Sequence, residues 1–551
     1  MTDYDIFKDD IPKNTVNKIK KILKNFGIEV EELLTSVNDE KSKFCPSIRI
    51  NIPNTSIGTN GKGSCIENCR ASGYGEFMER LQNLDLFVTN FPDEKAVNIE
   101  NINKNVLCNT NVNFECNQII TIPFYSIKDK NVADIPLYLI ETTTGQAAGN
   151  SVEEAFVQGL SEICERYAMK FVIENKLSLP QIPENEYIKY DKIKNIIKFY
   201  NDNGYEIFVK DASIGKKLPV VCVVAINKRE NILAFSFGAH PSLPISIERS
   251  LTELFQGRNI NDIKQNCITN DYYNKYFNAN LIALCEKLCI SPIFFKNNDD
   301  LTKQFISNDS CFEFNKDAWV NLSKKNSNKD LLKFLIRNIS PITQNNIYVR
   351  DVSFLGFPSI SIFIPTMSNF IQMNHSQYTQ IHKWKNYRGQ KDIFYNDIVS
   401  FFNLAEFISI HPLLSNSITN KYPIEYILLL CSILLKKYSK IREYANILID
   451  KYEIRKDNLI KIIREYYGYI SENFTEEDIK NKLSNKFTNS EIQFFYKFIN
   501  NLSFSVIKYL MISTEKGDIA KTSEISRKLQ KIYNENIPNQ MNLKKIFYDI
   551  F

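Results

Sequence analysis

Residues 63–80 read GSCIENCRASGYGEFMER, and residues 149–166 read GNSVEEAFVQGLSEICER. Glycine, glutamate and arginine recur at identical offsets in the two stretches, which begin 86 residues apart. Each stretch opens on glycine and a small polar residue, which is typical of a helix start. The pattern predicts two related helices, over 64–83 and 151–176.

Both predicted helices gather acidic residues on one face. Residues three or four apart share a helix face, so Glu76, Glu79 and Arg80 lie together. The second helix carries a stripe of the same kind, made of Glu154, Gln158, Glu162 and Glu165. A third predicted helix, over 245–263, adds Glu248, Arg249, Thr252, Glu253 and Gln256.

A single E-x-x-E-R pattern is usually a solvated helix face, with ion pairs worth about 0.3–0.5 kcal/mol each. Here Gly73, Gly75 and Gly159 interrupt the helices, and glycine inside a helix costs about 1 kcal/mol unless close packing requires it. Apolar neighbours such as Phe77 and Leu160 also indicate burial. Clustered buried carboxylates need cations to compensate them, and oxygen-only ligands favour Mg²⁺ or Mn²⁺. Several such ions beside arginines suit a nucleoside triphosphate.

Other nucleotide and metal sites fit the sequence less well. A Walker A sequence would need glycine at 56 and serine or threonine at 63, where the chain has Ser56 and Gly63. The glycine-rich residues 58–63 could still form a turn whose backbone N–H groups hold an anion. His240 in FGAHP (237–241) is interpreted as a turn histidine, and a role in the site stays open.

The twelve cysteines show no CxxC pair, and the chain has four histidines, so a zinc site is not indicated. Cys65 and Cys69 have the first spacing of a radical iron–sulfur motif, but Ser72 stands where the third thiolate is needed. Reduced thiols in a cytoplasmic protein are the expectation. The net charge of +5 calls for neither nucleic acid nor membrane as a partner, and residues 1–10 do not resemble a secretory leader.

The order of elements predicts an α/β (α+β) body over 1–389, followed by an all-helical domain over 390–551 that is possibly repeat-like. A leading helix is expected over 14–35, and further helices over 190–203, 426–438, 441–451 and 459–467. Strands are expected at 47–52, 118–126, 135–141, 206–211, 219–226, 232–237, 347–354 and 359–364.

Three separated blocks carry a family resemblance: TNGKG (59–63) with the first acidic helix, AGN (148–150) with the second, and FGAHP (237–241) with Glu248 to Arg258. Together they resemble the YcaO family over about residues 1–390. The resemblance implies an ATP-binding fold in which glutamates bind Mg²⁺ around the phosphates of ATP. Carried over, the metal ligands would be Glu76, Glu79, Glu162, Glu165 and Glu253. The residues that touch or brace ATP would be Lys8, Thr15, Asn150, Glu154, Arg166 and Arg249, with Arg249 and Glu253 as the catalytic pair.

Members of that family activate an amide by phosphorylating its oxygen, and they differ in the product. The helical C-terminal part and the lack of a proline-rich tail resemble the branch that assists β-methylthiolation of a small-subunit ribosomal protein. Expected partners are a protein or peptide substrate, such as a ribosomal protein with its radical methylthiotransferase, and a second copy in a homodimer. The alternatives are a peptide-tailoring cyclodehydratase, a thioamide-forming enzyme, or a non-catalytic scaffold.

Overall fold

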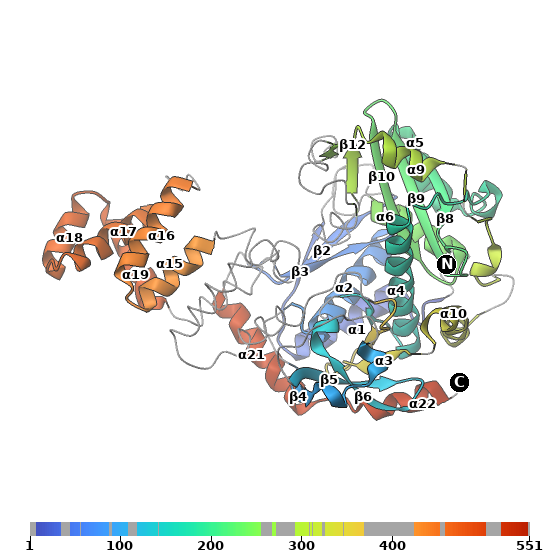
Figure 1. Cartoon of the computed structure of the whole chain (residues 1–551), viewed down its shortest axis with the longest axis horizontal. Coiled ribbons are helices and arrows are strands. Elements are labelled where there is room, and N and C mark those ends of the chain that lie inside the picture. The colour runs from blue at the N-terminus through green and yellow to red at the C-terminus, as the bar shows by residue number, and fades with distance from the viewer. Residues whose placement is uncertain are drawn as a thin grey trace. The chain divides into compact units, whose positions relative to one another are not determined.

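The computed structural model describes residues 7–34, 44–55, 57–86, 91–107, 118–140, 143–254, 267–270, 281, 293–307, 309–310, 312–321, 326–344, 346–368, 424–451, 458–502 and 519–548. The chain divides into two compact units. The first comprises Met1–Asn374 together with Glu524–Phe551, and the second comprises His375–Ser523. Each unit is considered by itself below (Figure 1).

The described strands of the first unit form three sheets. The first sheet, in the order β1-β2-β3, contains β1 (Glu31–Leu34), β2 (Ser47–Asn51) and β3 (Gly58–Lys62). The second, β11-β12-β10-β9-β8, contains β8 (Glu206–Asp211), β9 (Val220–Asn227), β10 (Ile232–Ala239), β11 (Ile268–Thr269) and β12 (Ile293–Lys296). The third, β4-β5-β13-β14-β7 with β6 beside β5, contains β4 (Lys95–Asn98), β5 (Gln118–Ser126), β6 (Asn131–Pro136), β7 (Gln146–Ala148), β13 (Tyr348–Asp351) and β14 (Ser359–Phe363).

Helix α4 (Val152–Glu174) is the centre of this unit. It packs against β9 and β10 of the second sheet and against β7 and β14 of the third (Figure 1). Helix α2 (Ile66–Gln82) covers β2 and β3, and α6 (Leu243–Leu254) covers β9 and β10. Residues of all three acidic helices line one cavity.

The remaining helices of the first unit cover its outside. They are α1 (Pro12–Asn25), α3 (Lys104–Leu107), α5 (Asp191–Asp202), α9 (Asp299–Ile306), α10 (Asn328–Thr343), α21 (Ile519–Glu535) and α22 (Leu543–Tyr548). The second unit is helical where it is described, with α15 (Ile424–Leu434), α16 (Tyr438–Lys451), α17 (Asn458–Ser471), α18 (Glu476–Ser484) and α19 (Asn489–Asn501). Among the described helices, none has the length and apolar character that crossing a bilayer requires.

The α+β architecture with a helical C-terminal region is confirmed, and two element predictions were wrong in detail. The leading helix ends at Asn25, because Gly27 takes a left-handed conformation (φ +62°) and the chain turns into β1. The strand predicted at 135–141 runs from 131 to 136 and is followed by a 3₁₀ turn over Leu137–Leu139.

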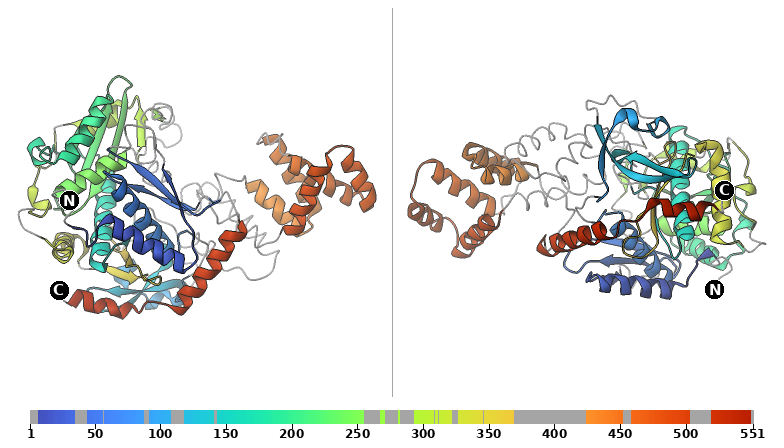
Figure 2. Two further views of the ribbon diagram at one scale, coloured as in Figure 1. Left: turned by 180° about the vertical axis from the view of Figure 1, so that it is seen from behind. Right: turned by 90° about the horizontal axis from the view of Figure 1, so that it is seen from below.

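The division into units also differs from the predicted boundary at 390. The last part of the chain returns to the first unit, since Ile525, Leu529 and Tyr533 of α21 pack in the same core as α1 and α2. Tyr533 stacks on Phe354, with ring centroids 4.1 Å apart, and its hydroxyl accepts a hydrogen bond from Arg350 at 3.0 Å. Figure 2 shows α21 and α22 lying along the first unit. A helical hydrophobic period cannot indicate which core a helix packs against.

We expect Leu529→Ala in α21 to destabilise the first unit by about 2–5 kcal/mol, because Leu529 is only 1% exposed in its core. Hydrogen–deuterium exchange should show faster exchange in α1 and α2, which are distant in sequence. The matched control is Ile537→Ala, since Ile537 is 43% exposed and its loss should change little. Unchanged exchange in α1 and α2 of the Leu529→Ala protein would contradict this packing.

Candidate active site

Helices α2, α4 and α6 line a cavity of about 490 Å³. Every residue that the sequence predicted for metal or ATP binding lines this cavity. They are Lys8, Thr15, Glu76, Glu79, Asn150, Glu154, Glu162, Glu165, Arg166, Arg249 and Glu253. Gln256 and Arg258 of the third block lie outside the described residues.

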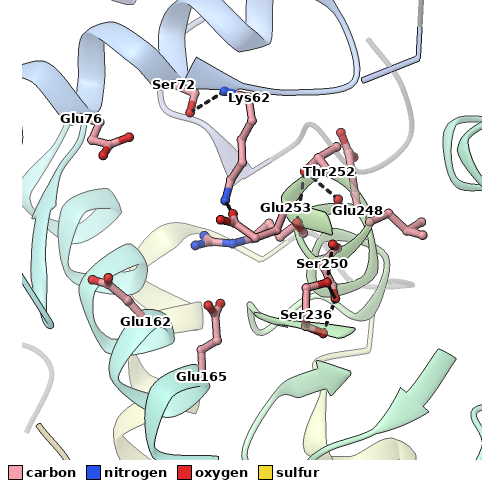
Figure 3. Close-up of polar contacts among 12 residues, drawn as sticks. Lys62, Ser72, Glu76, Glu162, Glu165, Ser236, Glu248, Ser250, Thr252 and Glu253 are labelled. Atoms are coloured by element: carbon pink, nitrogen blue, oxygen red, sulfur yellow. Dashed lines mark hydrogen bonds and ion pairs between the residues drawn. The ribbon is translucent and has the colours of Figure 1, made fainter. Parts of the chain in front are cut away.

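Four of the predicted metal ligands stand on α2 and α4, as the helical spacing predicts. Figure 3 shows Glu162 and Glu165 on α4 facing Lys62 and Glu253, with Glu76 of α2 beside them. Burial raises the pKa of Glu76, Glu79 and Glu165, because removal from water disfavours a charged carboxylate. The nearby cations offset this only in part.

Two arginines hold the carboxylates of their own helices. Arg80 Nη2 lies 3.4 Å from Glu79 and 3.8 Å from Glu76, and Arg166 Nη2 lies 2.6 Å from Glu162. Arg166 also donates to Thr144 Oγ1 at 2.8 Å. Glu76 and Arg80, like Glu162 and Arg166, are at positions i and i+4, which lie on one face of the helix. Arg249 reaches from α6 to the Gln158 side chain on α4, so it spans the cavity.

The start of α4 is tied to the N-terminal segment through Glu154. This carboxylate accepts hydrogen bonds from Lys8 Nζ at 3.0 Å, the Asp9 backbone N–H at 3.1 Å and Asn150 Nδ2 at 3.2 Å. Thr15 Oγ1 in turn lies 3.0 Å from Asn150 Oδ1. Burial alone would raise the pKa of Glu154, but Lys8 and the hydrogen bonds hold it below its usual range. Glu154 is therefore a bracing group with its acceptor sites filled.

Comparison with known proteins identifies the family of this chain. The sequence model of the YcaO family, described as a cyclodehydratase that binds ATP and Mg²⁺, matches residues 60–368. The chain belongs to the YcaO family. ATP and Mg²⁺ are accordingly the cofactors of this domain.

Two curated relatives match over part of their length. An uncharacterized protein of Haemophilus influenzae is 26% identical over 408 residues, covering 66% of this chain and 65% of that protein. The ribosomal protein S12 methylthiotransferase accessory factor YcaO of Escherichia coli is 29% identical over 295 residues, covering 46% of this chain and 50% of that protein. The chain thus spans between half and two thirds of the length of these relatives.

Two solved structures are similar at lower identity. A heterocyclase in complex with substrate and cofactor has a TM-score of 0.48 and 18% identity, over 65% of this chain and 53% of that one. YcaO from Methanopyrus kandleri bound with AMPPCP and Mg²⁺ has a TM-score of 0.47 and 15% identity, over 66% of this chain and 93% of that one.

The carboxylates of this YcaO domain suit magnesium that arrives with phosphate. Within the described ranges, no three Asp, Glu, His or Cys side chains are close enough to form a ready-made metal site. Mg²⁺ commonly takes one or two protein carboxylates and completes its octahedron with water and phosphate oxygens. Separate carboxylates around one cavity match that mode of binding, and burial raises the pKa of Glu76, Glu79 and Glu165 despite the cations beside them.

Lys62 belongs to the site although the sequence analysis gave it no role. Residues 58–62 form β3, which pairs with β2, so the expectation of an anion-binding turn was wrong. The Lys62 ammonium group contacts the Glu253 carboxylate in the cavity. Burial, together with the nearby Arg249, lowers its pKa to about 8. Lys62 could have been noticed because it stands in the TNGKG block (59–63). The direction of its side chain, however, is known only once β3 is placed beside β2.

The cysteine pair lies outside this chemistry. Cys69 is buried and donates from Sγ to the carbonyl oxygens of Pro46 and Gly61, both at 3.1 Å. Cys65 is partly exposed, and neither cysteine forms a disulfide. Cys69 is therefore a packing residue between α2 and β3.

We expect Glu165→Gln to remove a charge without breaking its hydrogen bond, because a glutamine oxygen can still accept from the Ala239 backbone N–H at 3.1 Å. The raised pKa means that ionisation of Glu165 opposes folding as pH rises above the usual value of 4.5. Without ligands at pH 7.5, the variant should melt roughly 1–3 °C higher than the wild type. Added Mg²⁺ and ATP should raise the Tm of the wild type but not that of the Glu165→Gln protein.

The difference in Tm between the ligand-free proteins should shrink as the pH falls toward 4.5 and below, where the carboxyl becomes protonated in the unfolded state as well. Equal stabilisation of both proteins by Mg²⁺ and ATP would show that Glu165 binds no metal.

Proposed function

We propose that the chain is an ATP-dependent enzyme that activates an amide of a protein or peptide by phosphorylating the amide oxygen. The observation that carries the proposal is that the five glutamates predicted as metal ligands meet Lys62 and three arginines in one cavity. A scaffold has no need of so many partly buried charges, which cost free energy when left without a ligand.

The proposed roles follow from where each group stands. The five glutamates would hold Mg²⁺ against the phosphates, with Glu253 beside the reacting group. Arg166 and Arg249 would contact phosphate, and Lys62 would neutralise charge near Glu253. Lys8, Thr15, Asn150 and Glu154 would hold the nucleoside part or brace the groups that do.

The reaction needs positioning and neutralisation of charge more than a protein nucleophile. The amide oxygen forms a bond to the γ-phosphorus while the bond to ADP breaks. A nucleophile adds to the amide carbon, and the phosphorylated oxygen then leaves as inorganic phosphate. The cavity groups would align the attack and stabilise the charge that develops on the phosphoryl oxygens.

Within this reaction class, we propose a role as accessory factor in β-methylthiolation of a small-subunit ribosomal protein. The supporting observations are the likeness to the E. coli accessory factor and the helical unit within the C-terminal part of the chain. A cytoplasmic location and a homodimer are part of the proposal. None of the seven described cysteines forms a disulfide, which supports the location. Peptide cyclodehydration is the alternative that the family description favours.

Purified full-length protein should hydrolyse ATP in the presence of Mg²⁺. Glu79→Gln and Lys62→Gln should each lower the rate roughly tenfold to a thousandfold, because each removes a charge from the cavity. Phosphate release gives the rates, and the matched control is Glu67→Gln, an exposed carboxylate on the same helix as Glu79.

When an acceptor amide carrying ¹⁸O is supplied, the label should appear in the released phosphate, which separates attack by the amide from attack by water. Hydrolysis that Glu79→Gln leaves intact would contradict the assignment of this cavity.

The accessory role predicts that the full chain restores β-methylthiolation of ribosomal protein S12 in an E. coli strain that lacks its YcaO protein. Mass spectrometry of S12 measures the modified fraction, and the Glu79→Gln protein should restore none of it. Failure of the wild-type chain, with ATP hydrolysis intact, would contradict the accessory role and favour a peptide substrate.

A further inference from the structure

His240 stands where β10 passes into α6, and its ring is fixed in one tautomer. Its Nδ1 accepts a hydrogen bond from the Ser242 backbone N–H at 2.9 Å. A ring nitrogen that accepts a hydrogen bond carries no proton, so in the neutral imidazole the proton is on Nε2. The backbone carbonyl of His240 is also used, since it accepts from Ser246 Oγ at 2.7 Å.

The imidazole is neutral near pH 7. His240 is only 8% exposed, and burial with the positive charges of Arg249 and Lys8 holds its pKa well below its usual value. The neutral ring lines the cavity, and Nε2–H has no hydrogen-bond partner among the described residues. A turn role accounts for Nδ1 and the carbonyl, but it leaves this donor unexplained.

The ring lies at the opposite end of α6 from Glu253. Ser242, which holds the ring, is eleven residues before Glu253. At 1.5 Å per residue, this separation is about 16 Å along the helix. Around His240 the cavity is lined by apolar side chains: the Phe7 ring centroid is 5.8 Å from that of His240, and Phe237 and Ile245 are cavity residues close in sequence.

We propose that His240 recognises the adenine base of ATP by donating Nε2–H to a ring nitrogen of the base. The inference rests on the proposed function, which places the triphosphate at the glutamate end of the cavity. With the phosphates near Glu253, the nucleoside extends along α6 toward its first turn. There a planar base finds the apolar side chains of Phe7, Phe237 and Ile245 beside one neutral donor, which is how a base is commonly held.

The test compares three substitutions at one position. His240→Asn keeps an acceptor near Nδ1 for Ser242 but removes the donor, His240→Phe removes both, and His240→Gln places an amide N–H near Nε2. Calorimetry with the full-length proteins should show that the Asn and Phe variants bind MgATP about three- to tenfold more weakly than wild type, with Gln nearer to wild type. Affinity for Mg²⁺ with tripolyphosphate, which has no base, should be unchanged in all three.

Base analogues identify the acceptor. One of 1-deaza-, 3-deaza- and 7-deaza-ATP should bind the wild type as weakly as ATP binds the His240→Phe protein. The His240→Phe protein should bind that analogue and ATP with equal affinity. Equal affinity of the wild type for ATP and all three analogues would overturn the inference, as would a parallel loss of tripolyphosphate binding. Variants that bind ATP normally but no longer react with an amide would assign the donor to the amide instead. If the wild type binds tripolyphosphate and ATP with equal affinity, this inference alone is overturned. If the wild type binds neither tripolyphosphate nor ATP, the proposed function is overturned as well.

Discussion

Arg80 pairs with Glu76 and Glu79, and Arg166 pairs with Glu162, so two helices bring their own cations to the cavity. Lys62 adds a third cation from β3, against Glu253. These pairs do not balance the carboxylates, because burial still raises the pKa of Glu76, Glu79 and Glu165. The approach of α2, α4 and α6 therefore depends on charge compensation that the protein supplies only in part. Divalent cations would complete it, which links the stability of this region to its ligands.

Close helix packing makes this concentration of charge possible. A Cβ on Gly61 of β3 would lie 2.1 Å from the carbonyl oxygen of Cys69, so only glycine allows β3 to contact α2 here. A Cβ on Gly159 would lie 2.9 Å from Ile362 Cδ1 of β14. These contacts fix the backbones that carry Lys62 and Glu162. Gly61 and Gly159 thus set the positions of the charged groups, although these two glycines do not line the cavity themselves.

Helical spacing was enough to predict which glutamates share a face, because that depends only on the chain's own geometry. The positions of α2 and α4 and of half the described strands of the first unit followed from local pattern in the same way. What could not be predicted depends on contacts between distant segments. Lys62 points into the cavity because β3 pairs with β2, and Leu529 packs with α1 and α2 although an all-helical domain was expected there. No local period carries that information.

The N-terminal segment is held on the site by an electrostatic requirement as well as by packing. The Glu154 side chain is only 7% exposed, whereas that of Lys8 is 61% exposed. A carboxylate so enclosed is costly without partners, so the larger share of the energy lies in satisfying Glu154 rather than in Lys8 itself. Asp9 N–H and Asn150 supply the other two hydrogen bonds, and Thr15 contacts Asn150 from α1. Removal of the Glu154 charge would therefore loosen Lys8 and its neighbours together, because that one carboxylate joins Lys8, Asp9 and Asn150.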